Sequence, residues 1–147
     1  MHYSLVADIE APPERVWPLF VDLEHWPTMT ASIREVYRID AGPLRLGSEA
    51  IVRQPRLPPM RWRVIALSPG HSFTWETTSA GVTTTGGHIV EARGDGSTVT
   101  LTLAQRGLLA GAVNAILGSL TRKYLSMELE GFRRAAESAH NSVSRIK

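Results

Sequence analysis

The hydrophobic and polar positions of the chain alternate with a period of two along most of its first 105 residues. Tyr3, Leu5, Ala7 and Ile9 alternate with mostly polar neighbours, which predicts a strand with one buried face. Six further segments read as strands after a short helical region. They cover residues 32–40, 48–54, 60–67, 72–78, 82–92 and 98–105. Short turns such as Gly94-Asp95-Gly96 join them, so we predict an antiparallel meander.

Two short helices are predicted between the first strand and the second. Prolines at 12 and 13 end the strand and suit the first positions of a helix whose apolar side includes Val16 and Phe20. Asp22 can cap a second helix over residues 23–26, and Pro27 stops it.

The pattern changes to helical spacing at residue 107, and one long helix is predicted over residues 107–138. Its main apolar face is Leu109, Val113, Ile116, Leu120, Tyr124 and Met127, widened by Leu108, Ala112, Leu117 and Leu125. At ~1.5 Å per residue such a helix is roughly 45 Å long and spans a whole sheet. We predict a single domain over residues 1–138 and a frayed polar tail over residues 139–147.

This order of elements predicts an α+β protein with a hollow centre. A seven-stranded sheet must bury one face, and only one predicted helix is long enough to cover it. One helix rarely fills the concavity of a curved sheet of that size. The pattern therefore indicates an internal cavity, and a cavity indicates a ligand.

Strand alternation assigns side chains to the inner face of this sheet. The inward positions are Ala50, Val52, Gln54, Met60, Trp62, Val64, Ala66, Phe73, Trp75, Thr77, Val82, Thr84, Gly86, His88, Val90, Val99, Leu101, Leu103 and Gln105. Two assignments stay open. In residues 32–40 either the Val36 face or the Tyr37 face points inward, and a bulge at Gly86-Gly87 would shift the register of His88.

Composition narrows the class of function. The chain has 147 residues, 43% of them hydrophobic and 20% charged, and a net charge of +2 with scattered arginines. These values fit a soluble globular protein and give no basis for nucleic-acid binding. There is no cysteine, and the five histidines lack metal-ligand spacing, so we expect no metal and no cofactor. No signal peptide and no transmembrane segment are recognised, so we expect a cytoplasmic protein without stable membrane insertion.

Several short motifs together resemble the START-like (SRPBCC) superfamily, and within it the bacterial polyketide cyclase/dehydrase-like branch, whose fold is shared with the birch-pollen allergen. They are Ala11-Pro12-Pro13-Glu14-Arg15-Val16-Trp17, Asp22 followed by Trp26-Pro27, Gly47, Gln54-Pro55, Trp62-Arg63-Val64, Phe73-Thr74-Trp75, Gly87-His88 and Gly96-Ser97-Thr98-Val99. The resemblance covers about residues 3–138. It implies a helix-grip fold, in which a curved antiparallel sheet wraps round the C-terminal helix, and it implies several functions rather than one. It also places Met29, where relatives often carry tryptophan, near the cavity mouth.

The candidate site is a set of apolar walls with a few orienting polar groups, as is usual for small-molecule pockets. We expect it to comprise Met29, Val52, Gln54, Met60, Trp62, Phe73, Trp75, Thr77, Thr84, His88, Gln105, Leu109, Val113, Ile116, Leu120 and Tyr124. His88 is the candidate acid or base, and the alternative is a buried histidine bonded to backbone or water. For Gln54 and Gln105 the alternative to ligand contact is hydrogen bonding to each other or to water.

Three functions fit these observations. The first is binding of a small hydrophobic ligand, lipid-like or polyketide-like, in the central cavity. The second is a polyketide aromatase/cyclase or dehydratase acting in the same cavity without metal or cofactor, with His88 as its acid/base group. The third is a regulatory or stress module that acts through protein contacts. The predicted partner is a small hydrophobic molecule, and the predicted assembly is a monomer or homodimer.

Overall fold

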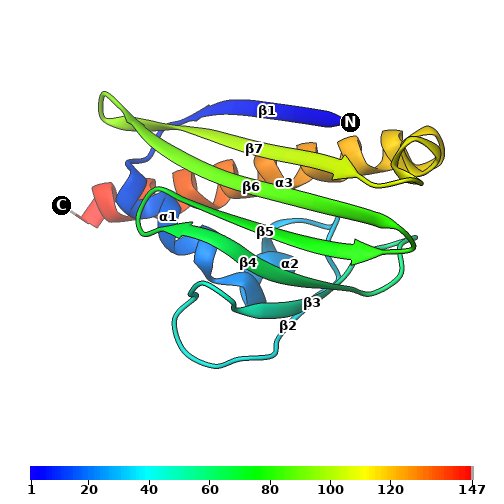
Figure 1. The fold of residues 1–147 in the computed structure, drawn as a ribbon. Helices are drawn as coiled ribbons and strands as arrows, with labels where there is room; N and C mark the ends of the chain where they lie inside the picture. The colour runs from blue at the N-terminus through cyan, green and yellow to red at the C-terminus, as the bar shows by residue number, and fades with distance from the viewer. Residues whose placement is uncertain (147) are drawn as a thin grey trace.

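A computed structural model describes residues 1–146 of the protein, and the side chains of residues 1–141. Seven strands form one antiparallel sheet, and the long helix α3 crosses one face of it (Figure 1). The elements are β1 (His2–Ile9), α1 (Pro13–Val21), η1 (Leu23–His25), α2 (Trp26–Met29), β2 (Glu35–Arg38), β3 (Glu49–Arg53), β4 (Met60–Ser68), β5 (Ser72–Ser79), β6 (Val82–Arg93), β7 (Gly96–Arg106) and α3 (Ala110–Ile146). The predicted α+β helix-grip fold is confirmed.

The sheet is a meander with its first strand added at the far edge. The strand order is β1-β7-β6-β5-β4-β3-β2, so every neighbour except β1 follows in sequence. β1 pairs with β7, with Leu5 opposite Leu101 and Ala7 opposite Val99. This pairing joins the two ends of the β region and places the α1 segment on the same face as α3.

Strand β2 is shorter than the sequence suggested. It covers Glu35–Arg38, whereas strand character was predicted over residues 32–40. Val36 is buried and Tyr37 is exposed, which decides the open choice of face in favour of Val36. The residues before β2 form a turn in which the hydroxyls of Thr30 and Ser32 bond to each other.

A bulge in β4 corrects one predicted face. Val64 pairs with Trp75, but Ala66 pairs with Thr74, so Ile65 is an extra residue in the ladder. The bulge reverses the alternation beyond it. Ala66, predicted to face inward, is exposed, and Leu67 packs on the core in its place.

Strand β6 has a regular register through Gly86-Gly87. His88 pairs with Phe73 of β5 and with Leu101 of β7. The bulge considered for this position is absent, and the ring of His88 faces inward, as strand alternation predicted.

Helix α3 begins at Ala110 and extends to Ile146. The predicted polar tail therefore continues the helix through residue 146, while Lys147 lies outside the described residues. The helix packs chiefly against β1, β7, β6, α1 and α2. Over the described residues, its backbone contacts with the other half of the sheet, β3 to β5, are sparse at most.

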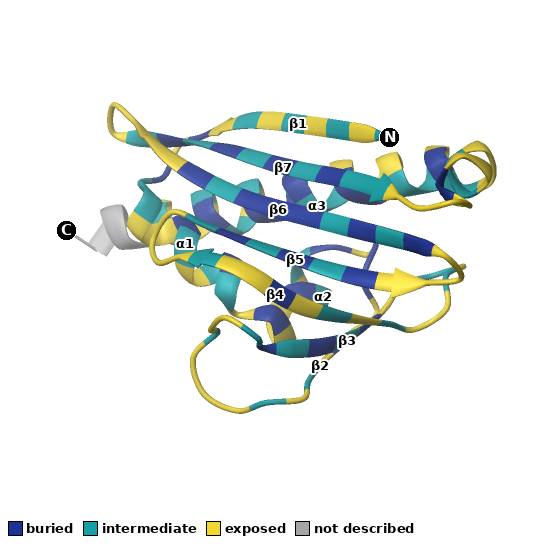
Figure 2. Cartoon of the chain, in the orientation of Figure 1, coloured by how far each residue is buried: buried dark blue, intermediate teal, exposed yellow. Residues whose placement is uncertain are grey.

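The packed core lies between the second half of α3 and the short helices. Phe132 of α3 contacts Phe20 of α1, with ring centroids 5.0 Å apart, and Trp26 of α2, at 5.5 Å. Figure 2 shows buried positions along the strand centres, while the start of α3 is mostly exposed. The second half of the helix is thus anchored, and the first half borders an open space.

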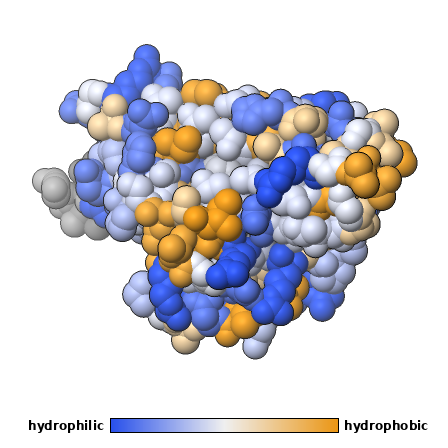
Figure 3. All heavy atoms as spheres, viewed as in Figure 1, coloured by the Kyte–Doolittle hydropathy of each residue, from blue (hydrophilic) through white to orange (hydrophobic). Residues whose placement is uncertain are grey.

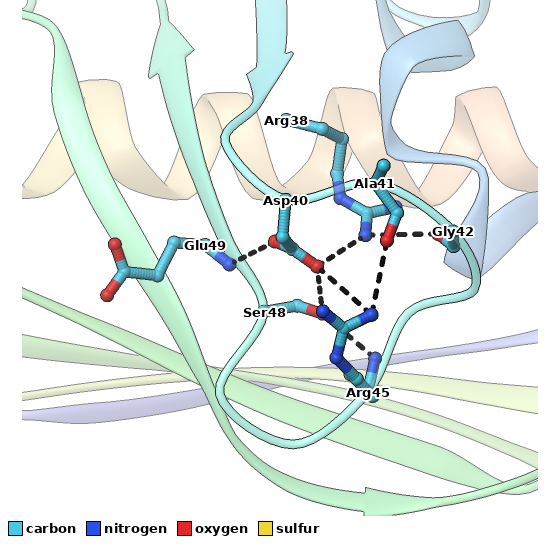
Figure 4. A network of polar contacts seen from close by, with 7 residues as sticks. All are labelled: Arg38, Asp40, Ala41, Gly42, Arg45, Ser48 and Glu49. Carbon is cyan, nitrogen blue, oxygen red and sulfur yellow. Dashed lines mark hydrogen bonds and ion pairs between the residues drawn. The ribbon is translucent and has the colours of Figure 1, made fainter.

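The carboxylate of Asp40, which is partly buried, holds the loop from β2 to β3 in place (Figure 4). Asp40 accepts hydrogen bonds from the Glu49 backbone N–H at 2.8 Å, the Ser48 hydroxyl at 2.9 Å and the Arg38 guanidinium at 2.9 Å. Partial burial would raise the pKa of Asp40, but these donors outweigh it and lower the pKa to about 2. The network holds β3, one wall of the open space, in register with its loop.

Candidate functional site, an internal ligand cavity

A cavity of about 270 Å³ lies between the sheet and the first half of α3. Every strand from β3 to β7 contributes to its walls, as do α2, α3 and the β3–β4 loop. The lining residues are Trp26, Ile33, Val52, Gln54, Leu57, Pro58, Met60, Trp62, Trp75, Ser79, Ala80, Val82, Thr84, Gly86, Gly87, His88, Thr102, Leu103, Gln105, Val113, Leu117, Thr121, Tyr124, Leu125 and Glu128. The hollow fold expected from the sequence therefore contains a real space.

Tryptophans form one wall of the cavity. The indoles of Trp62 and Trp75 stack with centroids 5.0 Å apart, and Trp26 meets Trp75 edge-on at 5.3 Å. Gly86 makes room for this arrangement, because a Cβ there would lie 3.2 Å from Nε1 of Trp75. The result is an aromatic wall suited to an apolar ligand.

Three polar side chains of the wall are held in place by backbone or side-chain partners. The Gln54 amide donates to the Ser32 carbonyl at 3.3 Å, and the Gln105 amide donates to the Thr84 hydroxyl at 3.4 Å. The Tyr124 hydroxyl donates to the Pro55 carbonyl. The Oε1 atom of Gln105 is buried and has no hydrogen-bond partner among the described residues. A buried acceptor of this kind is costly unless a ligand or water donates to it.

His88 lies at the floor of the cavity, where it joins the aromatic core. Its ring stacks on Phe73 with centroids 4.2 Å apart and also lies near Trp26, at 5.4 Å. Burial lowers the pKa of His88 to about 3, opposed by the backbone of Phe73, so the ring is neutral at pH 7. Its Nδ1 atom has no hydrogen-bond partner among the described residues. A catalytic role for His88 stays a prediction, and a pKa this low makes the neutral ring a weak proton acceptor.

Glu128 is the carboxyl-bearing residue of the lining, and the sequence reasoning missed it. It is one helical turn beyond Tyr124 and one turn before Phe132, on the face of α3 that meets the sheet. Burial raises the pKa of the Glu128 carboxyl to about 8. At pH 7 this group is therefore mainly a neutral carboxylic acid.

The cavity opens to solvent near the start of α3. Pro58, Ser79 and Ala80 line it and are exposed, which places the opening between the β3–β4 loop and the β5–β6 turn. Apolar side chains gather at this end of the molecule, where α3 begins (Figure 3). Leu108 and Leu109 are exposed there, and Leu109 lies beside Gly81 of the β5–β6 turn.

Ten of the predicted site residues line the cavity together. They are Val52, Gln54, Met60, Trp62, Trp75, Thr84, His88, Gln105, Val113 and Tyr124. Strand alternation accounts for eight of them, because it holds wherever the register is regular. Whether they contact a ligand stays a proposal.

Six predicted residues lie outside the lining. Phe73 and Thr77 face inward but are buried in the packed sheet, and Met29 packs against the core, with its carbonyl next to Gly131 of α3. Leu109 is exposed and Leu120 is half-buried. Ile116 is 80% exposed and points away from the sheet. The expectation that Met29 lies at the cavity mouth is thus not met, because the opening is at the other end of α3.

The predicted helix face was right at some positions and wrong at others, because the first half of α3 is apolar on several sides. Residues 108–117 include Leu108, Leu109, Val113, Ile116 and Leu117, which do not define one stripe. The stripe that meets the sheet passes through Leu117, Thr121, Leu125, Glu128 and Phe132. Two of its positions, Thr121 and Glu128, are polar, so a search for apolar periodicity does not include them. Spacing of three and four from Phe132 backward was the signal that locates Glu128.

Among the described residues, no group of three His, Cys, Asp or Glu side chains lies close enough together to hold a metal ion. Within the same part of the chain, no helix combines the length and the apolar content needed to cross a membrane.

Comparison with solved structures shows the same fold in proteins of low sequence identity. Norcoclaurine synthase from Thalictrum has a TM-score of 0.75 and 13% identity, over 95% of each chain. Major latex-like protein 151 from Panax ginseng has a TM-score of 0.72 and 17% identity, over 95% of this chain and 97% of that one. The di-domain ARO/CYC protein BexL of the BE-7585A pathway has a TM-score of 0.69 and 15% identity, over 93% of this chain and 46% of its own.

Comparison of the sequence itself adds the family. No curated protein matches the chain. A family model described as "Polyketide cyclase / dehydrase and lipid transport" matches residues 1–137, which confirms the START-like resemblance. With this match over nearly its whole length, the chain belongs to the polyketide cyclase / dehydrase and lipid transport family.

Proposed function

We propose that the protein binds a small hydrophobic molecule, polyketide-like or lipid-like, in the cavity between the sheet and α3. The observation that carries this proposal is the cavity itself, about 270 Å³ with tryptophan and aliphatic walls. Ligand pockets typically measure roughly 300–1,000 Å³, so this one is at the small end of the range. The size favours a compact ring system or a single short chain over a lipid with two long chains.

Polar groups around the walls support orientation of such a ligand. Gln105 offers an unpartnered carbonyl oxygen, and Gln54 and Tyr124 are held by bonds to the backbone. Fixed polar groups in an apolar wall select a ligand by the position of its own oxygen or nitrogen atoms. We propose that these three residues and His88 set the orientation of the ligand.

Native mass spectrometry of freshly purified protein, followed by denaturing extraction, tests the proposal. A co-purifying apolar molecule supports it and identifies its chemical class. The second arm measures quenching of tryptophan fluorescence by fatty acids, sterols and aromatic polyketides. An unoccupied protein that none of these compounds quenches would contradict the binding function.

Two substitutions on the same helix separate cavity binding from surface adsorption. Leu117 lines the cavity, so Leu117→Trp should fill part of it and weaken binding at least tenfold. Ile116, its neighbour in sequence, is 80% exposed, so Ile116→Trp should leave the affinity unchanged. Equal effects of the two changes would show that the ligand does not enter the cavity.

A cyclase or dehydratase is the second candidate, and the observation that favours it is the presence of two titratable groups, His88 and Glu128, in the lining of one mainly apolar cavity. Cyclisation and dehydration of a polyketide need a proton acceptor, a proton donor and a fixed substrate geometry. We expect His88→Ala to abolish product formation from a poly-β-keto thioester while binding is retained. Unchanged turnover in His88→Ala would exclude His88 as the proton acceptor.

A cytoplasmic location stays a prediction.

A further inference from the structure

Glu128 is a carboxyl group inside an apolar cavity without a counter-charge. Among the described residues, neither lysine nor arginine lines the cavity. No described hydrogen bond or ion pair involves the Glu128 side chain, while its neighbours on α3, Glu130 and Arg133, pair with each other on the outer side. Glu128 lines the cavity and is partly buried.

The two hydroxyl donors that lie near Glu128 on α3 are already used within the protein. Tyr124 donates to the Pro55 carbonyl, and Thr121 donates to the Leu117 carbonyl at 2.9 Å. A protonated Glu128 is therefore a donor in this part of the lining that has no protein acceptor. A ligand that presents an oxygen atom could accept the hydrogen bond from Glu128.

The protonation state follows from the surroundings. An ionised carboxylate in an apolar enclosure without a cation loses its hydration and gains nothing in return. Burial accordingly raises the pKa of Glu128 to about 8. The other titratable groups of the lining are His88 of β6 and Tyr124 of α3 itself. Since burial lowers the pKa of His88 to about 3, its charge is constant from pH 6 upward.

We propose that Glu128 is a neutral carboxylic acid that donates a hydrogen bond to a carbonyl oxygen of the cavity ligand. This inference rests on the proposed binding function and specifies its ligand class as an apolar molecule that carries a ketone or similar carbonyl. A buried carboxyl group can donate a hydrogen bond at pH 7 because it stays neutral, since ionisation would leave its charge unsolvated. The same bond would polarise the carbonyl of a bound substrate if the protein is an enzyme.

Two probes of matched shape test the proposal. 2-Acetylnaphthalene carries a ketone, and 2-isopropenylnaphthalene has a methylene group in place of the ketone oxygen. Their affinities are measured by quenching of tryptophan fluorescence between pH 6 and pH 9. We expect the ketone to bind about tenfold more weakly at pH 9 than at pH 7, since ionisation removes the donor above its pKa of about 8. The hydrocarbon should show no such loss.

Variants locate the effect at Glu128. Glu128→Gln keeps an N–H donor without a titration, so the ketone should still bind, with an affinity that no longer depends on pH. Glu128→Leu removes the donor, so the preference for the ketone over the hydrocarbon should fall roughly tenfold. Tyr124→Phe should retain the pH dependence. Glu130→Gln, on the outer side of the same helix, should behave as the wild type.

The outcomes separate this inference from the function on which it rests. If neither naphthalene binds the wild type, the binding function fails and the inference falls with it. If the hydrocarbon binds but the ketone shows no pH dependence and no response to Glu128→Leu, the inference alone is overturned. Stronger ketone binding above pH 8 would overturn it as well, because the ionised form would then be the binding form. The wild-type titration decides even if a variant does not fold.

Discussion

Substitution of Glu128 by glutamine should stabilise the protein, and the gain should grow with pH. Glutamine has nearly the same size and keeps the packing between Leu125 and Phe132, but it carries no titratable proton. In the unfolded chain a glutamate ionises with an ordinary pKa of 4.5, whereas burial raises the folded pKa of Glu128 to about 8. The folded wild type therefore loses stability relative to the variant between these two pH values.

The sign and size follow from proton linkage. Below pH 4.5 both states hold the proton, so the carboxyl contributes no difference. As the pH rises towards 8, only the unfolded state releases it, and each pH unit favours unfolding by about 1.4 kcal/mol. At pH 7 this amounts to at most about 3 kcal/mol. Water that enters the open cavity reduces the cost, so we expect a gain of about 1–2 kcal/mol for Glu128→Gln.

Urea unfolding followed by tryptophan fluorescence at pH 5, 6, 7 and 8 measures this difference. The stability difference between Glu128→Gln and the wild type should be small at pH 5, increase to pH 8 and level off above it. At pH 7 the melting temperature should rise by roughly 3–6 °C for a domain of this size. Glu130→Gln is the control, because Glu130 pairs with Arg133 on the exposed side and its pKa is lowered. A difference that stays constant from pH 5 to pH 8 would refute the reasoning, since Glu128 would then be ionised in the folded protein.

Three further perturbations test other parts of the structure. His88→Leu should make the protein lose less stability as the pH is lowered below 6.5. The unfolded histidine binds a proton below its ordinary pKa of 6.5, whereas the buried one does not until about pH 3. Urea unfolding at pH 5 should therefore show a pH-induced loss of stability about 2 kcal/mol smaller in the variant than in the wild type. Gly86→Ala should push the Trp75 indole, 3.2 Å from the added Cβ, into the cavity and weaken probe binding, whereas Gly111→Ala, with no atom within 4 Å, should not; equal affinities would contradict the account of the wall. Asp40→Asn should cost about 1 kcal/mol at pH 7, and the cost should vanish as the pH falls from 3.8 towards 2, because the lowered pKa of Asp40 reports its bonds to Ser48 and Glu49; a pH-independent cost would mean that packing, not charge, holds the loop.

Much of the fold follows from two simple periods in the sequence. Period-two alternation places Trp62, Trp75 and Gln105 on the inner face because backbone geometry forces successive side chains to opposite sides. The order of strands and the single long helix then leave a space that no element fills. This reasoning fails where the register changes. No residue type around Ile65 predicts the bulge that adds one residue to β4.

The face of α3 was harder to predict than the strands. Its first half is apolar on several sides, so periodicity admits more than one orientation, and Ile116 proved to be exposed. The orientation is set by the anchored second half, through Phe132 and Leu129. Glu128 lies on the resulting stripe as a polar residue among apolar ones, a pattern that a search for hydrophobic positions treats as solvent-facing. Once Phe132 is known to be buried, the spacing of three and four residues back from it places Glu128 on the inward face.

The unfilled volume between the sheet and α3 has a thermodynamic consequence for how a natural ligand can be found. Cavities in protein cores cost about 24 cal/mol per Å³, so 270 Å³ corresponds to at most about 7 kcal/mol of packing energy that the side chains do not supply. That is comparable with the whole stability of a typical domain, 5–15 kcal/mol. A molecule that fills the cavity would supply the packing contacts that the side chains do not make, so the melting temperature would rise with the concentration of that molecule. Thermal stability itself thus becomes a detector, and fractions of a cell extract can be ranked by how far each one raises the melting point.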